Sequence, residues 1–393
     1  MLAITGGRVE TISHGAIPHG TILIDDNGKI VAVGQSINIP SGTTVIDASG
    51  QYVFPGFIDS HSHIGVFNDG EGRDNADGNE LTDPVTPGVR VIDAFSTIDR
   101  ALDDAIQGGI TAAWVTPGSG NVIGGQGATL RLWGKTIDEM ILKAPSGMKS
   151  AMGENPKRVY GSRQKMPATR LGVAKIMRQA FYDAEDYGRQ LEKDPEHKQN
   201  VDWDALVLVL NRKIPLRTHA HTADDILTAI RIGREFGVDH IIEHGTEAYK
   251  VVDELLRYNI PVSCGPALVA RVKVEVRGRT FKTPGILAKN GIKVSIITDH
   301  PVVPEQYLVV SAALAVREGM DEPDAIRALT QTPADLCGVG DRLGSIEPGK
   351  DGDLVIWNGH PFDYKSQVSK TIILGRVVYD RERVTERSSK TDQ

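Results

Sequence analysis

Two histidines one residue apart close an apolar stretch near the N-terminus, where FPGFIDSHSHIGV spans residues 54–66. Because residues i and i+2 of a strand point to the same face of a sheet, His61 and His63 would project together from the end of one strand. Such a pair suits a metal ion, but it also arises by chance in a chain with 11 histidines. By itself the pair therefore leaves an ordinary role at the rim of a sheet open.

Three further residues of ligating types stand near the ends of other expected strands. His219 lies in IPLRTHAH (214–221), His244 closes DHIIEH (239–244) and Asp299 closes IKVSIITD (292–299). Imidazole nitrogen and carboxylate oxygen are the ligands expected for zinc or a similar divalent ion in a hydrolytic site with an open position. The pattern predicts that these side chains converge with the first pair on one metal centre, provided that the strands share a sheet.

The middle of the chain has the alternation needed to build such a sheet. Eight apolar stretches are expected to be strands, at 56–61, 109–117, 127–133, 147–154, 214–221, 239–245, 260–264 and 292–299. Most are separated by helical patterns, which implies right-handed crossovers and a parallel sheet. Among the helix starts, we expect Thr222 to be an N-cap with Asp225 three residues later, and Thr332 to be an N-cap before Pro333. Eight such units closed into a (β/α)8 barrel would place all functional loops at the carboxyl ends of the strands.

Both ends of the chain have a different pattern. Short strand-like runs with glycine and Asp-Asn-Gly turns fill residues 1–53 and recur at 343–385, which predicts antiparallel β structure at both termini. The fold class is therefore α/β, with two domains. Residues 54–342 form the barrel, and residues 1–53 plus 343–393 form one small, discontinuous β-sandwich.

Composition restricts the partners. The formal net charge is −7, so neither nucleic acid nor an anionic membrane surface would be attracted electrostatically, and a small molecule is the expected partner. The two cysteines, Cys264 and Cys337, provide neither a disulfide framework nor a cysteine metal cluster. No stretch approaches the ~18 unbroken apolar residues of a membrane span, and we expect a cytoplasmic protein.

The motifs together resemble a known family. FPGFIDSHSH, the histidines of THAH and IEHG, the ITDHP segment and the closing phrase GSIEPGKDGDLVIWN are similar to motifs of the metal-dependent amidohydrolase superfamily, nearest its imidazolonepropionase-related and dipeptidase (prolidase)-like branch. The resemblance implies a distorted (β/α)8 barrel, a homo-oligomer and two divalent ions, with zinc first and manganese or iron as alternatives. It further implies that His61, His63 and Asp299 hold one ion, and that His219 and His244 hold the other.

The same resemblance implies a bridge between the ions, which in many relatives is a carboxylated lysine or a glutamate at the end of the fourth barrel strand. That part of the chain reads GMKSAMGENPKRVYG (147–161). Glu154 stands at the expected strand end, and we predict that it is the bridge. Lys149 lies five positions earlier, on the opposite face of a regular strand, and a carboxylated Lys157 is the remaining alternative.

Two residues are candidates for contacting substrate. His221 follows His219 by two positions and faces the same way, although a role at the helix start is equally compatible. Arg271 belongs to the charged segment ARVKVEVRGRTFK (270–282), and its guanidinium suits a substrate carboxylate. The alternative for this segment is that it stays solvated or pairs with the acidic loop 67–84.

These observations predict a hydrolase of a carbon–nitrogen bond in a small molecule, either an amide or a cyclic amide, and dipeptide-like in one version. A metal-activated hydroxide would attack the carbonyl, and Asp299 would shuttle its proton to the leaving nitrogen. One alternative is a mononuclear deaminase or imidazolonepropionase-type hydrolase, whose relatives often carry an acid where this chain has His221 and Thr222. A non-catalytic scaffold is the other alternative, although every expected ligand type is present.

Overall fold

The computed structural model describes residues 1–70, 72, 76–194 and 196–383. Its central element is an eight-stranded sheet whose order follows the chain. The strands are β6 (Phe57–Ser62), β7 (Ile110–Val115), β8 (Ile123–Arg131), β9 (Ile141–Ala151), β10 (Leu216–Ala220), β11 (His240–His244), β12 (Val262–Cys264) and β13 (Val294–Ile296). Backbone bonds bring the two edges together just beyond the strand ends, since Asp299 N–H donates to His61 O (3.2 Å) and His63 N–H donates to His300 O (3.0 Å). The sheet is therefore a nearly closed barrel, as the sequence predicted.

The third strand departs from the expected parallel arrangement. Strand β8 pairs antiparallel with both β7 and β9, whereas the other neighbouring pairs of this sheet are parallel. Residues 116–122 join β7 to β8 without a helix. So short a connection suits antiparallel strands, because parallel neighbours need a crossover of about a dozen residues or more. The prediction of an all-parallel sheet was wrong at this strand, and the barrel is distorted there.

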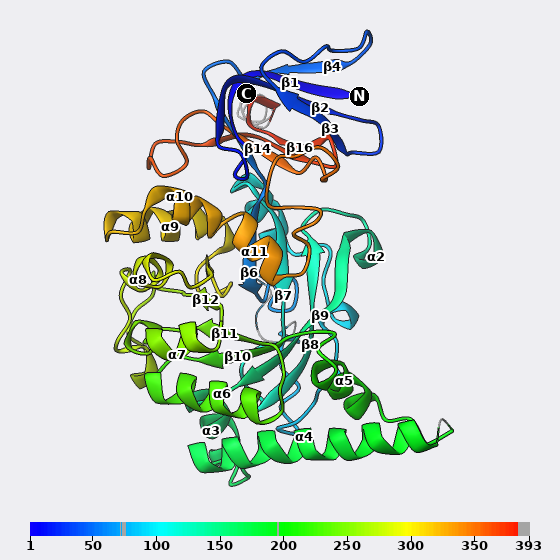
Figure 1. Cartoon of the computed structure of the whole chain (residues 1–393), viewed down its shortest axis with the longest axis vertical. Helices are drawn as coiled ribbons and strands as arrows, with labels where there is room; N and C mark the ends of the chain where they lie inside the picture. Colours follow the sequence, from blue (N-terminus) through cyan, green and yellow to red (C-terminus); the bar gives the residue numbers. More distant parts are fainter. Residues whose placement is uncertain (71, 73–75, 195, 384–393) are drawn as a thin grey trace.

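Helices cover the outside of the barrel (Figure 1). They are α1 (Arg100–Gln107), α2 (Ile137–Met140), α3 (Glu154–Gly161), α4 (Arg170–Lys193), α5 (Val201–Leu210), α6 (Ala223–Glu235), α7 (Val252–Arg257), α8 (Thr283–Lys289), α9 (Leu308–Arg317), α10 (Glu322–Arg327) and α11 (Gln331–Leu336). Thr222 caps α6 as expected, because its side chain accepts the backbone N–H of Asp225. The expected cap at Thr332 was wrong, since α11 already includes this residue and begins after Thr330.

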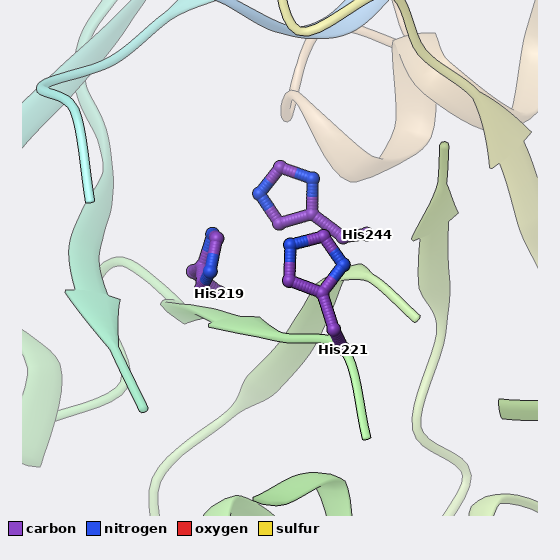
Figure 2. Close-up of side chains that lie close together, drawn as sticks. All are labelled: His219, His221 and His244. Atoms are coloured by element: carbon purple, nitrogen blue, oxygen red, sulfur yellow. The ribbon is translucent and has the colours of Figure 1, made fainter. Parts of the chain in front are cut away.

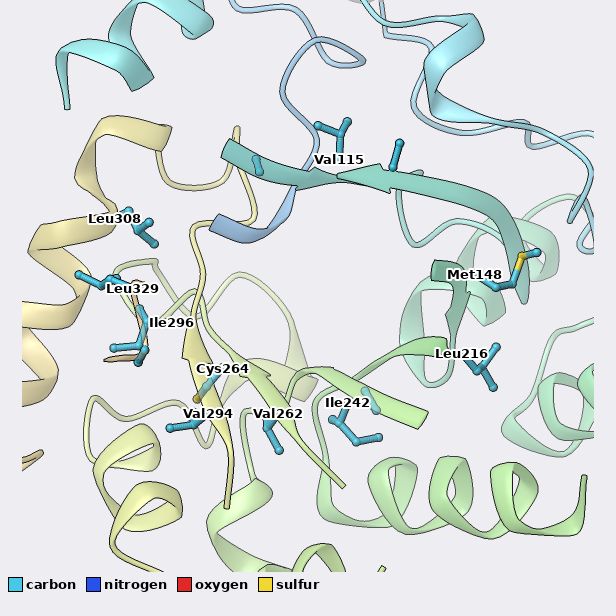
Figure 3. Close-up of a cluster of buried hydrophobic side chains, with 14 of the residues drawn as sticks. Val115, Met148, Leu216, Ile242, Val262, Cys264, Val294, Ile296, Leu308 and Leu329 are labelled. Carbon is cyan, nitrogen blue, oxygen red and sulfur yellow. The ribbon is translucent and has the colours of Figure 1, made fainter. Parts of the chain in front are cut away.

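The barrel core lies between the sheet and these helices. Figure 3 shows apolar side chains on the outer face of the strands, among them Leu216, Ile242 and Val262, directed toward the surrounding helices. All three are fully buried. Burying one such side chain contributes roughly 1.5–3 kcal/mol, so this layer holds the helices on the barrel while the inner face is left for polar residues.

Strands from both ends of the chain form a second sheet, as expected. It contains β1 (Leu2–Glu10), β2 (Ala16–Ile24), β3 (Ile30–Gly34), β4 (Thr44–Asp47), β5 (Tyr52–Pro55), β14 (Leu354–Trp357), β15 (Val368–Ile373) and β16 (Arg376–Asp380). The junction between the two termini is the antiparallel pairing of β5 with β14. This terminal sheet lies at one end of the barrel (Figure 1). The domain boundaries at residues 53 and 343 stay predictions.

One buried ion cluster ties the terminal sheet to the barrel. Arg131, the last residue of β8, donates through Nε to Asp353 (2.9 Å) and through Nη2 to Asp351 (2.8 Å), two residues that precede β14. All three side chains are at most 5% exposed.

Within the described residues, no helix is long and apolar enough to cross a membrane.

Candidate metal centre

Five histidine rings meet at the carboxyl ends of the barrel strands, and each is anchored through Nδ1. In three of them the partner can only accept a hydrogen bond: His61 Nδ1 meets Glu243 Oε2 (2.7 Å), His63 Nδ1 meets Thr116 O (2.7 Å) and His244 Nδ1 meets Gly265 O (2.9 Å). The Nδ1 atoms must therefore carry the proton and donate. In a neutral ring this leaves Nε2 as the free lone pair, which is the form that binds a metal ion.

The other two rings are anchored on hydroxyl groups. His219 Nδ1 lies 2.9 Å from Ser119 Oγ, and His221 Nδ1 lies 2.7 Å from Thr246 Oγ1. A hydroxyl oxygen can accept the Nδ1 proton, so these rings can adopt the same tautomer as the first three. All five Nε2 atoms are then available on the inner side of the site.

The Nε2 atoms face Asp299 and one another in two groups. Asp299 Oδ1 lies 3.2 Å from His63 Nε2 and 3.4 Å from His61 Nε2, and ligand atoms of His61, His244 and Asp299 lie within 4.8 Å of one another. The rings of His219, His221 and His244 form the second group (Figure 2), and their ligand atoms also lie within 4.8 Å of one another. The five metal ligands predicted from the histidines and Asp299 are thus brought together by the structure, and His221 joins them.

Burial favours the singly protonated form of four of the five rings at neutral pH. Loss of solvent lowers the pKa of His221 to about 4 and lowers the pKa values of His63, His219 and His244 as well. An anionic carboxylate among neutral imidazoles is a donor set that a divalent cation would complete.

Two of the predicted ligands, His244 and Asp299, are oriented by left-handed backbone rather than by strand alternation. Glu243 points into the barrel, so regular alternation would turn His244 outward, yet His244 has φ of +73° and its ring returns to the site. Asp299 has φ of +54°. Non-glycine residues in this region are strained, and such strain gathers at functional sites.

A buried network of charged side chains holds the ring of His61 in place. Arg217 Nε donates to Glu243 Oε1 (2.6 Å), while Glu243 Oε2 accepts the proton of His61 Nδ1. Although burial opposes it, the charge of Arg217 together with His61 lowers the pKa of Glu243 to about 2. The guanidinium also lies 3.6 Å from the ring centroid of Trp114. This network fixes the tautomer and orientation of His61, as outer carboxylates do for ligating histidines.

The predicted bridge and its alternatives lie in different places from those expected. Lys149 is fully buried inside the barrel, and its Nζ lies 3.2 Å from His61 Nε2; the expectation that it occupies the opposite face was wrong. Burial lowers the pKa of Lys149 to about 8. Glu154 is the first residue of α3, and its carboxylate belongs to neither group of ligating atoms found among the described residues. Lys157 lies in the same helix.

Lys149 and Glu154 differ from their expected positions because strand β9 ends between them. The strand stops at Ala151, and Gly153 (φ +76°) turns the chain before Glu154. The period of two that relates Lys149 to Glu154 therefore does not extend that far. Inside the strand, Lys149 and Ala151 share a face, and Lys149 is level with Arg217 on β10.

The rim adds two residues that sequence reasoning missed. Glu275 Oε1 lies 3.4 Å from His219 Nε2, 3.6 Å from His221 Nε2 and 2.6 Å from Lys273 Nζ. The sequence carries no clear signal for them, because Val272 and Val274 are the exposed residues of this segment while Lys273 and Glu275 are largely buried. Arg271 instead is exposed and donates through Nε to Arg277 O (3.1 Å). Residues 71 and 73–75 of the acidic loop lie outside the described part of the chain.

A barrel with histidines and an aspartate at the carboxyl ends of its strands is the arrangement found in the family to which the chain is similar. The chain belongs to the amidohydrolase family, whose model matches residues 52–378. An amidohydrolase from Thermotoga maritima MSB8, known from a crystal structure, is 44% identical to this chain in sequence. The two structures superpose with a TM-score of 0.94, and the match covers 97% of this chain and 100% of the other.

Relatives of lower sequence identity include enzymes with different activities. The amidohydrolase tasK of Hapsidospora irregularis is 28% identical over 92% of this chain, and an imidazolonepropionase of Thermoplasma volcanium is 23% identical over 93% of this chain and 92% of its own length. The chain spans less than two thirds of the first curated relatives that it matches, and only 40% of tasK.

Proposed function

We propose that this protein is a metal-dependent hydrolase that cleaves a carbon–nitrogen bond of a small molecule. The bond would belong to an amide or a cyclic amide, and a dipeptide-like substrate is one candidate. The observation that carries the proposal is the shared arrangement of five histidines, whose Nδ1 atoms are held by the protein and whose Nε2 atoms are left for an ion beside Asp299. Membership of the amidohydrolase family supports it.

The donor set suits two divalent ions, and zinc is the first choice because imidazole and carboxylate are its common ligands. His61, His63 and Asp299 would hold one ion, and His219 and His244 the other. We assign the bridge to Lys149 in its carboxylated form rather than to Glu154, because Lys149 Nζ is the buried group beside His61 Nε2. Bound ions would lower the pKa of water toward ~7 and polarise the scissile carbonyl.

The residues of the chain supply the proton transfers and the orientation. Asp299 is 16% exposed and faces both rings of the first pair, so its carboxylate can accept a proton from the attacking water and return it to the leaving nitrogen. Glu243 and Arg217 hold His61 in one orientation during this exchange.

Substrate selection is assigned to the rim. Lys273, 18% exposed beside the site, is a cation that can meet a substrate carboxylate. Arg271 remains a predicted substrate contact, and an Arg271→Ala enzyme with unchanged KM would remove it from that role. The cytoplasmic location and the homo-oligomer also stay predictions.

The deciding experiment combines metal analysis with a hydrolysis screen. Protein purified without chelator is analysed for zinc, manganese and iron per chain, and it is then tested on amides, cyclic amides, N-acyl amino acids and dipeptides before and after chelator treatment. About two ions and hydrolysis that chelator abolishes and zinc restores would support the proposal. A single ion together with deamination of amino-substituted heterocycles would favour the mononuclear deaminase instead.

A further inference from the structure

His221 has the same contact pattern as the residues assigned to metal binding. Its Nδ1 is held by Thr246 Oγ1 at 2.7 Å, and its side chain is 4% exposed. Within the described residues, His221 Nε2 and His244 Nε2 are both buried without a hydrogen-bond partner. A buried polar atom without a partner is unfavourable, so two neighbouring Nε2 atoms in this state are suited to binding one cation between them.

The geometry of the three rings suits one ion. Ligating atoms of His219, His221 and His244 lie within 4.8 Å of one another, and three nitrogens on a tetrahedral zinc, each bonded at about 2.0–2.1 Å, lie about 3.3 Å apart. His219 lies on β10 and His244 on the adjacent parallel strand β11, and His221 directly follows β10. Figure 2 shows the three rings facing one another. A small closing movement of the side chains would bring them onto the ion.

A carboxylate stands on the open side of this group. Glu275 is 2% exposed, and its Oε2 accepts the backbone N–H of Glu154 at 2.9 Å. Its other oxygen, Oε1, is directed at His219 Nε2 and His221 Nε2. A buried carboxylate needs a compensating positive charge, which Lys273 supplies in this structure and which a cation held by the three rings would also supply.

We propose that His221 is a metal ligand, so that His219, His221 and His244 hold the second ion through their Nε2 atoms and Glu275 contributes a carboxylate oxygen to the same ion. This inference rests on the proposed metal centre and replaces the substrate-contact role predicted for His221. The second ion would then be held by three imidazoles and one carboxylate, in addition to the bridge proposed at Lys149.

Cobalt and zinc binding test the proposal without reference to activity. Chelator-stripped protein is titrated with Zn²⁺ against a chromophoric chelator, using the native chain, His221→Asn and Glu275→Gln. His240→Asn is the matched control, because His240 is also a buried histidine of the same sheet, with Nε2 held by Thr218 Oγ1 at 2.7 Å. We expect His221→Asn to weaken one of two ions at least 100-fold, Glu275→Gln to weaken it about 10-fold, and the control to keep both ions.

A thiol at the same position provides a spectroscopic test. His221→Cys keeps a ligating atom, because a thiolate binds Co²⁺ and Zn²⁺. A sulfur-to-cobalt charge-transfer band should therefore appear in the near ultraviolet for His221→Cys, and it should be absent from His240→Cys and from the native chain with its own two cysteines. Circular dichroism of each variant controls for folding.

The outcomes separate this inference from the proposed function. Two ions that bind His221→Asn as tightly as the native chain, with no cobalt band in His221→Cys, would overturn the ligand role of His221 and leave the hydrolase proposal intact. A native chain that binds no divalent ion would overturn both.

Discussion

Lys149 Nζ and His61 Nε2 lie 3.2 Å apart inside the barrel, although 88 residues separate them in the chain. The lysine is fully buried, and its partner is one of the residues assigned to the first ion. A lysine that is fully buried beside a histidine ring cannot act as an ordinary surface cation. Its position is the strongest reason to place the bridge on β9 rather than on α3.

Replacing Lys149 tests this assignment. Lys149→Met should lower the metal content from about two ions per chain to about one or fewer and reduce kcat/KM at least about 100-fold, because the bridging group is lost while the volume is kept. The matched change Glu154→Gln should leave both values near those of the native chain. Elemental analysis of the two variants measures the difference. A Glu154→Gln protein that loses an ion would return the bridge to Glu154.

Asp299→Asn removes the proposed proton carrier. We expect kcat to fall by about 10²–10⁴-fold, the range typical of a lost general acid–base group, since an amide cannot take the proton. Metal content is measured in parallel, because Asp299 is also assigned to the first ion. Asp138→Asn on α2 serves as a control far from the site. Full activity in Asp299→Asn would contradict the shuttle.

Arg131 is expected to matter for stability rather than for chemistry. Arg131→Met leaves the buried carboxylate of Asp353 without its guanidinium, whereas Asp351 keeps its ion pairs with Lys29 and Arg342. Removing one partner of a buried pair typically costs about 3–5 kcal/mol in the free energy of unfolding. Arg90→Met, which loses only an exposed pair with Asp93, should cost less than about 1 kcal/mol. Urea unfolding of the two variants measures both losses in the free energy of unfolding. Equal losses would show that the Arg131 cluster does not stabilise the junction between the barrel and the terminal sheet.

His240 should make the protein less stable in mild acid. Burial lowers its pKa to about 4, so below pH ~6.5 the unfolded chain binds a proton that the folded chain does not. The free energy of unfolding therefore falls as pH drops from ~6.5 toward ~4, by up to about 1.4 kcal/mol per pH unit from this residue. Between pH 7.5 and pH 5, the native chain should lose about 2 kcal/mol more than His240→Asn. Urea unfolding of samples with matched metal content measures this, and parallel losses would refute it.

Some of the site could be predicted because its residues repeat with the period of a strand. His61 and His63, and likewise His219 and His221, are two positions apart on or at the ends of regular strands, so each pair shares a face wherever the strands lie. The alternation of apolar runs with helical patterns predicted the barrel for a similar reason, since the pattern is local. Asp299 was found from its place at a strand end, although its left-handed backbone was not.

Other parts of the site depended on where the chain leaves regular geometry or on partners far apart in the sequence. The orientation of Lys149 relative to Glu154 changed because β9 ends at Ala151 and Gly153 redirects the chain. Strand β8 runs antiparallel because its connection to β7 is too short for a crossover.

The sequence by itself determined the ligand types, their pairing by strand period and the β structure of both termini, because each of these depends on neighbours a few residues away. Only the tertiary structure decided that Glu243 holds His61 across 182 residues and that Glu275 faces His219 and His221. Closing the barrel brings these side chains together, and no local pattern records which distant residues a closed sheet will place in contact.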